Sequence, residues 1–157
     1  MRIEQRASQL LRDSRKTVAL AESCTGGLMG SMLTSLPGAS YYFLASFVTY
    51  SNQSKVDVLG VHDRTLMEHG AVSAECAREM AVGARRTGRA DYGVSVTGIA
   101  GPGGGSAIKP VGLVYLAVDD GISCMVEKHL FPGDREEVRQ AAAARALEML
   151  CERLDEI

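Results

Sequence analysis

The chain has 157 residues, the size of one domain, of which 46% are hydrophobic and 23% charged. This composition is typical of a globular protein and argues against disorder and against a coiled coil. The 17 basic and 19 acidic residues give a net charge of -2, so the chain has no overall positive field for DNA or RNA. A 5% aromatic content offers little for base stacking.

Membrane, disulfide and metal signals are weak throughout the sequence. No apolar run approaches the roughly 20 residues that cross a bilayer, and the first residues lack the apolar core of a signal peptide. The four cysteines contain no CxxC pair, and the three histidines lack the HxH and HExxH spacings of metal ligands. We therefore expect a cytoplasmic protein with no membrane segment, no disulfide framework and no metal site.

The hydrophobic pattern predicts alternating helices and strands. Apolar residues at positions 3, 7, 10 and 11 form one helical stripe, and residues 17–21 are a short apolar run typical of a strand buried on both faces. The predicted helices are 2–14, one that ends by residue 36, a short one that carries Lys55 and runs to residue 60, 74–88, and a last one from residue 135. The predicted strands are 17–21, 43–50, 92–96, 112–118 and 122–130.

Capping and turn residues give this pattern its boundaries. Ser73 and Asp134 are good N-caps, the latter with Glu137 at the third helical position, and Asp119-Asp120-Gly121 predicts an antiparallel hairpin between the last two strands. The order of elements indicates one mixed sheet covered by helices. Ligands of such sheets bind where strands run out into loops, so the expected site lies among the loops 22–27, 50–55 and 97–109.

The first of these loops reads Glu22-Ser23-Cys24-Thr25-Gly26-Gly27. A serine at a strand-to-helix turn exposes its hydroxyl beside unpaired backbone N–H groups, which can hold an oxyanion or a phosphate. The two glycines let a ligand approach the backbone closely. Ser23 or Thr25 also fits a plain helix cap, and these residues alone favour that interpretation. The turn is not the GxSxG elbow of α/β-hydrolases.

The second loop places Lys55 shortly after Tyr50, at the start of a short helix. A lysine there sits at the positive end of the helix dipole, and burial would lower its pKa further. A partly neutral lysine can act as a general base. Most lysines are instead solvated on the surface, and the local sequence favours that interpretation.

Two further segments could bind an anion. The loop 97–105 holds five glycines in nine residues but matches neither the Walker A nor the GxGxxG pattern. It fits an anion nest or a flexible linker, and Lys109 adds a cation at its end. Arg135 and Arg139 share one face at the positive end of the last helix, where a phosphate would relieve their repulsion. Neighbouring acidic residues could offset the same charges.

In their order and spacing, these motifs resemble the CinA C-terminal domain family, the nicotinamide mononucleotide deamidases of PncC type. The resemblance extends over nearly the whole chain and predicts one amidase domain over residues 1–157. It rests on the segments Ala21 to Gly27, Phe47 to Asn52 with Lys55, Gly70 to Ser73, Thr97 to Gly104, Lys109 to Gly112, Gly133 to Arg135, and Val138-Arg139.

The resemblance implies an α/β/α sandwich with a mixed, mostly parallel sheet and one antiparallel hairpin. It also implies hydrolysis of the carboxamide of nicotinamide mononucleotide to nicotinate mononucleotide and ammonia, in NAD salvage, without metal or cofactor. The family's serine, lysine and tyrosine fall on Ser23, Lys55 and Tyr50. Our hypothesis is a Ser–Lys acyl-enzyme mechanism in which Tyr50 relays a proton to the leaving ammonia. Cys24 is a rival nucleophile.

We expect backbone N–H groups of the 23–27 turn to stabilise the oxyanion, and arginines and the glycine loop to hold the 5′-phosphate. The residues expected to bind the substrate are Thr25, Gly26, Gly27, Thr97, Gly98, Gly101, Gly103, Gly104, Lys109, Arg135 and Arg139.

The sequence departs from the family pattern in two places. Ser46 and its neighbours occupy a strand position where the family often has glycine, and Ile108 precedes Lys109 where an acidic residue is common. These 157 residues do not include the larger N-terminal domain of full-length CinA proteins, so we expect the stand-alone form. Two other functions stay open, an amidase for a different amide and a non-catalytic nucleotide-binding or regulatory module. We also expect a homodimer or a larger homo-oligomer.

Overall fold

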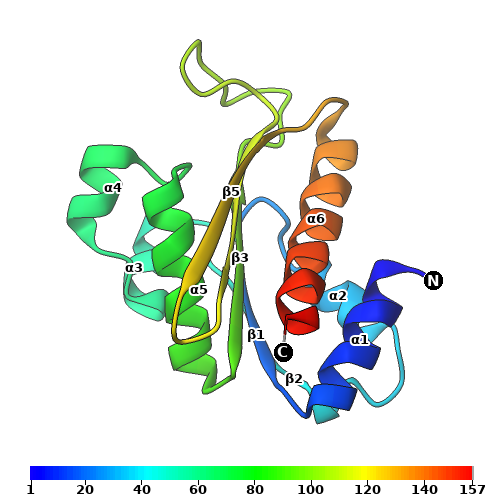
Figure 1. The fold of residues 1–157 in the computed structure, drawn as a ribbon. Helices are drawn as coiled ribbons and strands as arrows, with labels where there is room; N and C mark the ends of the chain where they lie inside the picture. Colours follow the sequence, from blue (N-terminus) through cyan, green and yellow to red (C-terminus); the bar gives the residue numbers. More distant parts are fainter. Residues whose placement is uncertain (157) are drawn as a thin grey trace.

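The structure is a computed structural model that describes residues 1–156, and its centre is a five-stranded sheet (Figure 1). β1 pairs in parallel with β2 and β3, whereas β4 pairs antiparallel with β3 and β5. Four of the five strands therefore run in one direction, which confirms the mixed, mostly parallel sheet and its antiparallel hairpin. In the order β2-β1-β3-β4-β5, the strands are β1 (Val18–Glu22), β2 (Phe43–Val48), β3 (Tyr92–Gly98), β4 (Leu113–Asp119) and β5 (Cys124–Leu130).

Helices cover both faces of the sheet and complete the predicted α/β/α sandwich (Figure 1). On one face lie α1 (Ile3–Ser14), α2 (Leu28–Thr34) and α6 (Arg135–Asp155), and on the other lie α3 (Asn52–Leu59), α4 (Asp63–His69) and α5 (Ala74–Gly88). A short 3-10 helix, Ala39–Tyr41, leads into β2.

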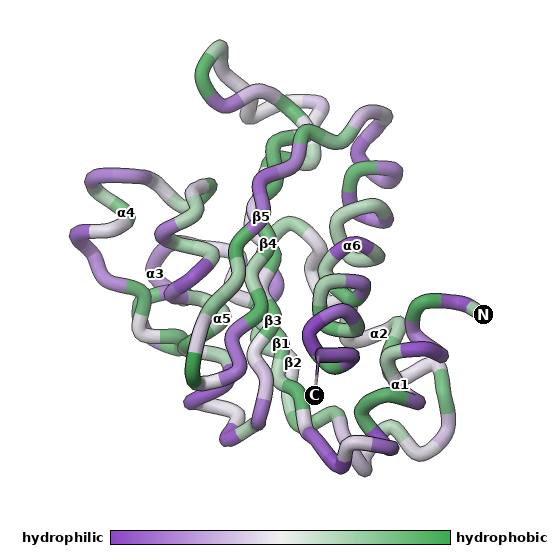
Figure 2. Tube along the Cα trace, in the orientation of Figure 1, coloured by the Kyte–Doolittle hydropathy of each residue, from purple (hydrophilic) through white to green (hydrophobic). Residues whose placement is uncertain are grey.

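The central strand β1 shows why the sheet is buried on both faces. Val18 and Leu20 join the core on the α6 side, whereas Ala19 and Ala21 join the core on the α5 side. Alternate side chains of a strand point to opposite faces, so a nearly all-apolar strand serves both layers. Figure 2 shows hydrophobic stretches in green along the strands between the two helical layers.

Polar caps fix several helix starts as predicted. Asp134 accepts a hydrogen bond from the Glu137 N–H at 2.9 Å, and the Glu137 carboxylate accepts one from the Asp134 N–H at 3.1 Å, which completes the capping box of α6. Ser73 caps α5 by accepting from the Cys76 N–H at 3.2 Å. Ser51 caps α3 by accepting from the Ser54 N–H at 3.1 Å.

Two local features differ from the sequence prediction. Helix α4 was not predicted, because it buries none of its residues and so lacks an apolar stripe. Leu66 packs against the core, and Glu79 of α5 accepts hydrogen bonds from the His62 N–H at 2.8 Å and the Thr65 hydroxyl at 2.6 Å. Strand β2 ends at Val48, so Tyr50 lies in the following loop rather than at the strand end.

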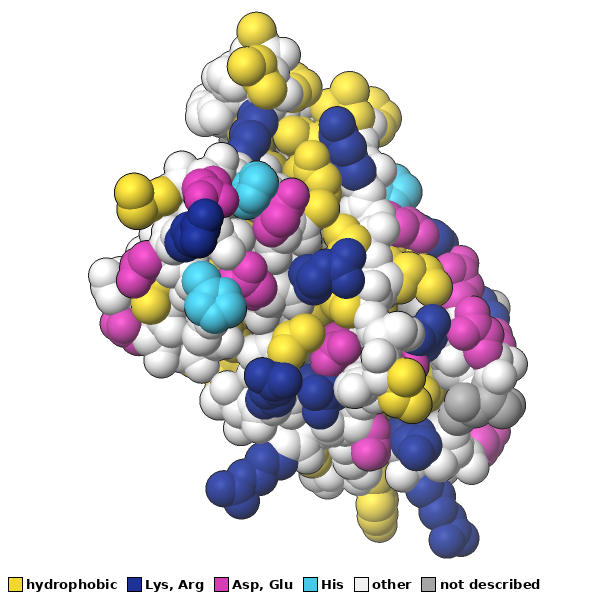
Figure 3. Space-filling model, turned by 60° about the vertical axis from the view of Figure 1, so that its left-hand side comes forward, with side chains coloured by type: hydrophobic (Ala, Val, Ile, Leu, Met, Phe, Trp, Pro, Cys, Tyr) yellow, Lys and Arg dark blue, Asp and Glu magenta, His cyan; other side chains and the backbone are white. Residues whose placement is uncertain are grey.

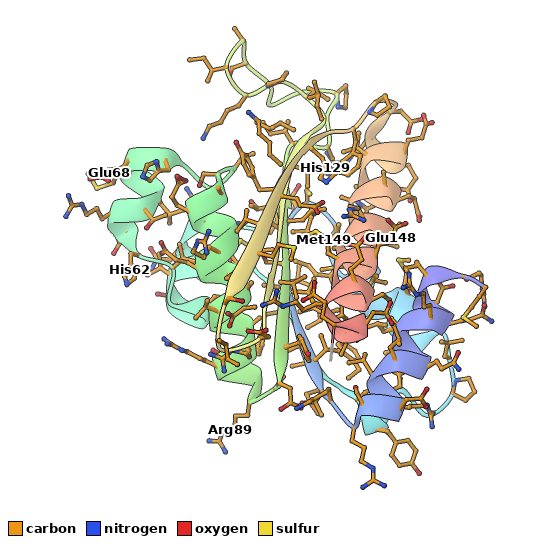
Figure 4. The ribbon with its side chains drawn as sticks, in the orientation of Figure 1. His62, Glu68, Arg89, His129, Glu148 and Met149 are labelled. Atoms are coloured by element: carbon orange, nitrogen blue, oxygen red, sulfur yellow. The ribbon has the colours of Figure 1, made fainter. Side chains whose placement is uncertain are left out.

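The described residues carry no strong membrane or metal signal. No helix in residues 1–156 is both long and apolar enough to span a bilayer. Within the same range, no three His, Cys, Asp or Glu side chains group closely enough to hold a metal ion. Two of the three histidines, for example, lie on different elements: His62 at the start of α4 and His129 on β5 (Figure 4). On the face shown in Figure 3, basic and acidic side chains are intermingled.

The topology brings three loops to one edge of the sheet. β2, β1 and β3 are parallel neighbours, so their carboxyl ends meet at this edge. Ser23 follows β1, Tyr50 follows β2, and the glycine-rich loop follows β3. The edge is therefore where the predicted site residues can converge.

Candidate active site

Ser23 stands at the first residue after β1, at the entrance to a tight turn. Its N–H donates to the Val96 carbonyl on β3 at 3.1 Å, and the residue is only 8% exposed. The turn continues through Gly26 and Gly27, whose φ values of +58° and +107° belong to the left-handed region that glycine adopts readily. The chain thus reverses into α2 while the Ser23 hydroxyl stays at the sheet edge.

Lys55 lies within α3 and its side chain is buried, with 1% of the residue exposed. Its Nζ is 3.0 Å from the Ser23 Oγ, 2.7 Å from the Thr49 carbonyl oxygen and 3.2 Å from the Tyr50 carbonyl oxygen. The surface-lysine interpretation was therefore wrong. The short helix that follows β2 carries Lys55 back to the loop after β1, so residues 32 positions apart are in contact.

The contacts of Lys55 favour a neutral amine. Burial lowers the pKa of Lys55 below its usual value, and no carboxylate in residues 1–156 forms a salt bridge with Nζ. A neutral amine has two N–H groups and one lone pair. Because the Thr49 and Tyr50 carbonyls can only accept, they can take both N–H groups and leave the lone pair for the Ser23 hydroxyl proton. This arrangement can activate a serine.

Cys24 is the neighbouring thiol and a poor rival nucleophile. It is 6% exposed, and burial raises the pKa of its thiol to about 11. The thiolate is the reactive form of cysteine, so a raised pKa keeps Cys24 protonated and inert near neutral pH.

A cavity of about 260 Å³ opens above the Ser23–Lys55 pair. This volume is close to the lower end of the roughly 300–1,000 Å³ typical of small-molecule sites. Nine of the residues predicted to form the site line it, namely Ser23, Tyr50, Lys55, Thr97, Gly98, Gly101, Gly103, Gly104 and Arg135. The predicted convergence of three loops therefore yields one cavity.

Several lining residues were not predicted. Asn52 comes from the start of α3, and Ala71 and Val72 come from the loop between α4 and α5. The Thr97 hydroxyl donates to the Ala71 carbonyl at 2.9 Å, which holds that loop against β3. Ala71 and Val72 fall in a quoted family motif, but small apolar side chains carry no chemical signal of their own. Ile99 and Ala100 complete the lining within the glycine-rich loop.

Arg135 and Tyr50 form the polar rim of the cavity. The Arg135 guanidinium donates to the Gly101 carbonyl at 2.8 Å and to the Tyr50 hydroxyl at 3.3 Å. Tyr50 is 61% exposed, and its phenol points to Arg135, whereas its backbone carbonyl contacts Lys55. The rim thus presents one cation and one hydroxyl to an entering ligand.

Five residues predicted to bind substrate lie outside the cavity lining, namely Thr25, Gly26, Gly27, Lys109 and Arg139. The Thr25 hydroxyl donates to Glu22, and the Arg139 guanidinium donates to the carbonyls of Cys24 at 3.1 Å and Thr25 at 3.0 Å. Lys109 donates to the His69 carbonyl at the end of α4. These side chains brace the loops around the site.

Glu22 is the main site residue whose role the sequence did not reveal. It is fully buried and accepts hydrogen bonds from the Thr25 and Ser46 hydroxyls and from two N–H groups of α2. Ser46 of β2 occupies a position where the family often has glycine, and its hydroxyl donates to the Glu22 carboxylate at 2.7 Å. Local sequence could not reveal these bonds, because the donors lie 3, 7, 8 and 24 positions further along the chain.

Comparison with known proteins places the site in a family. The model of the CinA C-terminal domain matches residues 1–154. A CinA-like protein of Citrifermentans bemidjiense is 53% identical over 148 residues, covering 94% of this chain and 36% of that protein. A CinA-like protein of Desulforapulum autotrophicum is 51% identical, covering 97% of this chain and 36% of that protein. The chain therefore spans little more than a third of the length of these curated relatives.

Solved structures match over nearly their full length. Competence/damage inducible protein CihA from Agrobacterium tumefaciens is 45% identical, with a TM-score of 0.92 over 98% of this chain and 95% of that one. A CinA superfamily protein from Klebsiella pneumoniae is 32% identical, with a TM-score of 0.95 over 99% of this chain and 97% of that one. Sequence and backbone agree along the whole described length, and the chain belongs to the CinA C-terminal domain family.

Proposed function

We propose that this chain is an amidohydrolase that converts nicotinamide mononucleotide to nicotinate mononucleotide and ammonia, in NAD salvage. The observation that carries the proposal is the 3.0 Å contact between the buried Lys55 amine and the Ser23 hydroxyl, at the base of a cavity. A serine paired with a general base is the arrangement that acyl-transfer chemistry requires. The choice of substrate rests on the family resemblance and on the cationic rim.

The reaction begins when Lys55 takes the Ser23 hydroxyl proton while Oγ attacks the carboxamide carbon. The backbone hydrogen bonds of the turn use the N–H groups of Ser23, Gly26 and Leu28 but not those of Cys24, Thr25 and Gly27. Of the latter three residues only Cys24 lines the cavity, so we assign its N–H as a donor to the tetrahedral oxyanion, where one donor contributes about 3 kcal/mol. The protonated Lys55 then gives its proton to the departing nitrogen, and ammonia leaves. Lys55 then deprotonates a water that attacks the acyl carbon, the bond to the Ser23 oxygen breaks as that oxygen takes the proton back from Lys55, and nicotinate mononucleotide leaves.

Tyr50 takes a binding role in this scheme rather than the proton relay expected from sequence. Its phenol contacts Arg135, whereas the Lys55 amine already contacts the Ser23 hydroxyl and can serve both proton transfers. We assign Arg135, with N–H groups of the glycine-rich loop, to the 5′-phosphate, because a guanidinium matches the geometry of phosphate oxygens. We do not assign Arg139 to this role, because its guanidinium donates to two carbonyls of the turn.

The test is ammonia release from nicotinamide mononucleotide. Ser23→Ala and Lys55→Ala should each abolish turnover, whereas the exposed pair Ser35→Ala and Lys128→Met should retain it. Near-wild-type activity in either of the first two variants would exclude the Ser–Lys pair.

Two other functions have distinct signatures in the same assay. An amidase for a different amide would show no preference for nicotinamide mononucleotide over free nicotinamide, because the phosphate contacts would contribute nothing. A non-catalytic module would bind the nucleotide and release no ammonia. The buried Lys55 disfavours the second case, since burying an amine beside a hydroxyl has an energetic cost that binding alone does not require.

A further inference from the structure

Glu22 is a buried carboxylate directly beside the proposed nucleophile. It is the last residue of β1, it is 0% exposed, and both of its oxygens are fully engaged. Oε1 accepts from the Thr25 hydroxyl at 2.8 Å and the Met29 N–H at 2.9 Å. Oε2 accepts from the Gly30 N–H at 3.0 Å and the Ser46 hydroxyl at 2.7 Å. A buried charge is tolerated when it is fully hydrogen-bonded in this way.

These bonds replace a missing helix cap. Helix α2 follows Gly27, which has no side chain and therefore cannot accept from the first-turn N–H groups. The Leu28 N–H donates to the Thr25 carbonyl, and the next two N–H groups, of Met29 and Gly30, donate to Glu22. A side chain from the preceding strand thus does what an N-cap residue normally does.

The same bonds fix the turn that carries Ser23. The Thr25 hydroxyl donates to the Glu22 carboxylate, and the Ser23 N–H donates to the Val96 carbonyl. The carbonyls of Cys24 and Thr25 accept from the Arg139 guanidinium. Glu22 does not line the cavity and cannot touch a ligand there. Its influence on chemistry must therefore pass through the position of the turn.

We propose that Glu22 is a positioning residue that holds the turn so that the Ser23 hydroxyl meets the Lys55 lone pair. This inference rests on the proposed function only in taking Ser23 as an activated nucleophile. It makes no use of the identity of the amide substrate.

Phenylmethylsulfonyl fluoride tests the inference without the substrate. In its reaction the Ser23 oxygen forms a bond to sulfur, the sulfur–fluorine bond breaks, fluoride leaves, and the hydroxyl proton passes to Lys55. Mass spectrometry of the Ser23 peptide measures the rate of modification. Turnover of nicotinamide mononucleotide is measured in parallel to separate kcat from KM.

Glu22→Gln is the key variant, because the amide keeps the shape but replaces one acceptor oxygen by a donor. We expect modification of Ser23 to slow at least tenfold and kcat to fall by a similar factor, with KM within twofold of wild type. Glu127→Gln is the matched control. It removes a hydrogen-bonded carboxylate between β5 and α6, outside the cavity, and should leave both rates within twofold.

Two milder variants decide the matter if Glu22→Gln does not fold. Thr25→Val removes the donor within the turn and should slow modification at least threefold, whereas Ser46→Ala removes the donor on β2 and should slow it less. Wild-type rates in Glu22→Gln, or in both milder variants, would overturn the inference. So would a fall in turnover with unchanged modification, or a wild-type Ser23 that resists the reagent.

The outcomes also separate this inference from the proposed function. If the wild-type protein releases no ammonia from nicotinamide mononucleotide, yet its Ser23 reacts and Glu22→Gln slows that reaction, the substrate assignment fails and the positioning role stands.

Discussion

Two basic side chains of this molecule, the buried Lys55 and the half-buried Arg145, have opposite surroundings. Arg145 of α6 donates to three carboxylates, those of Glu127, Glu148 and Glu152, at 2.8 to 3.2 Å. Lys55 has only uncharged oxygens around its amine. The pKa of Arg145 is raised by its hydrogen bonds to the carboxylates, while burial lowers the pKa of Lys55. Arg145, which stabilises the fold, is paired with carboxylates, whereas Lys55, the proposed base, has no carboxylate partner.

Removing the unpaired amine should have the largest effect. Lys55→Met keeps an unbranched side chain one heavy atom shorter and deletes the base, so kcat for ammonia release should fall about 1,000-fold or more. Glu127→Gln, in the paired region, should leave kcat within twofold. Substantial turnover by Lys55→Met would show that the Lys55 amine is not the base.

The paired region should respond in stability instead. Hydrogen bonds from Arg145 lower the pKa of Glu127 to about 2, from a usual value of 4.5. A lowered carboxylate pKa stabilises the folded state above pH 4.5, and this contribution disappears as the pH falls toward 2. Glu127→Gln should therefore lower the free energy of unfolding at pH 7 by about 2 kcal/mol, allowing for solvent screening. Urea denaturation at pH 7 and pH 3 measures the difference, which should shrink at the lower pH.

How far the sequence could predict these regions depends on the range of the interactions. The strands, the Asp134 capping box and the hairpin at Asp119-Asp120-Gly121 are local patterns, and each is present in the structure. Helix α4 escaped prediction because it buries none of its residues fully, and its contacts with Glu79 and with the core through Leu66 depend on tertiary structure.

The site depended on tertiary geometry that no local pattern encodes. Around Lys55 the sequence favours a solvated lysine, and only the adjacency of β1 and β2 in the sheet buries it against Ser23. The resemblance to a family supplied the pairing that local reasoning could not. Side-chain directions were equally inaccessible, since Arg139 and Arg135 are four residues apart on one helix, yet one braces the turn and the other lines the cavity.

The two arginines of α6 allow a smaller and more specific prediction. Arg135→Met should raise KM for nicotinamide mononucleotide about tenfold, because an exposed charge-assisted contact to phosphate is lost. Rates with unphosphorylated nicotinamide should be unchanged. Arg139→Met should lower kcat rather than raise KM, since it braces the carbonyls of the turn. Equal effects on both substrates in Arg135→Met would argue against a phosphate-binding rim.

The unpaired amine also predicts a pH dependence of the same sign as that of Glu127, but in a higher pH range. Burial lowers the pKa of folded Lys55 below the usual 10.5. Between these two values the unfolded chain binds a proton that the folded chain does not, so stability rises with pH in this window. The unfolding free energy of the wild type should therefore rise with pH relative to that of Lys55→Met, by at most about 1.4 kcal/mol per pH unit. Turnover should rise over the lower part of the same range, as Lys55 loses its proton. Urea denaturation from pH 6 to pH 10 measures the two unfolding free energies. A difference between them that does not change with pH would mean that burial does not lower the pKa of Lys55.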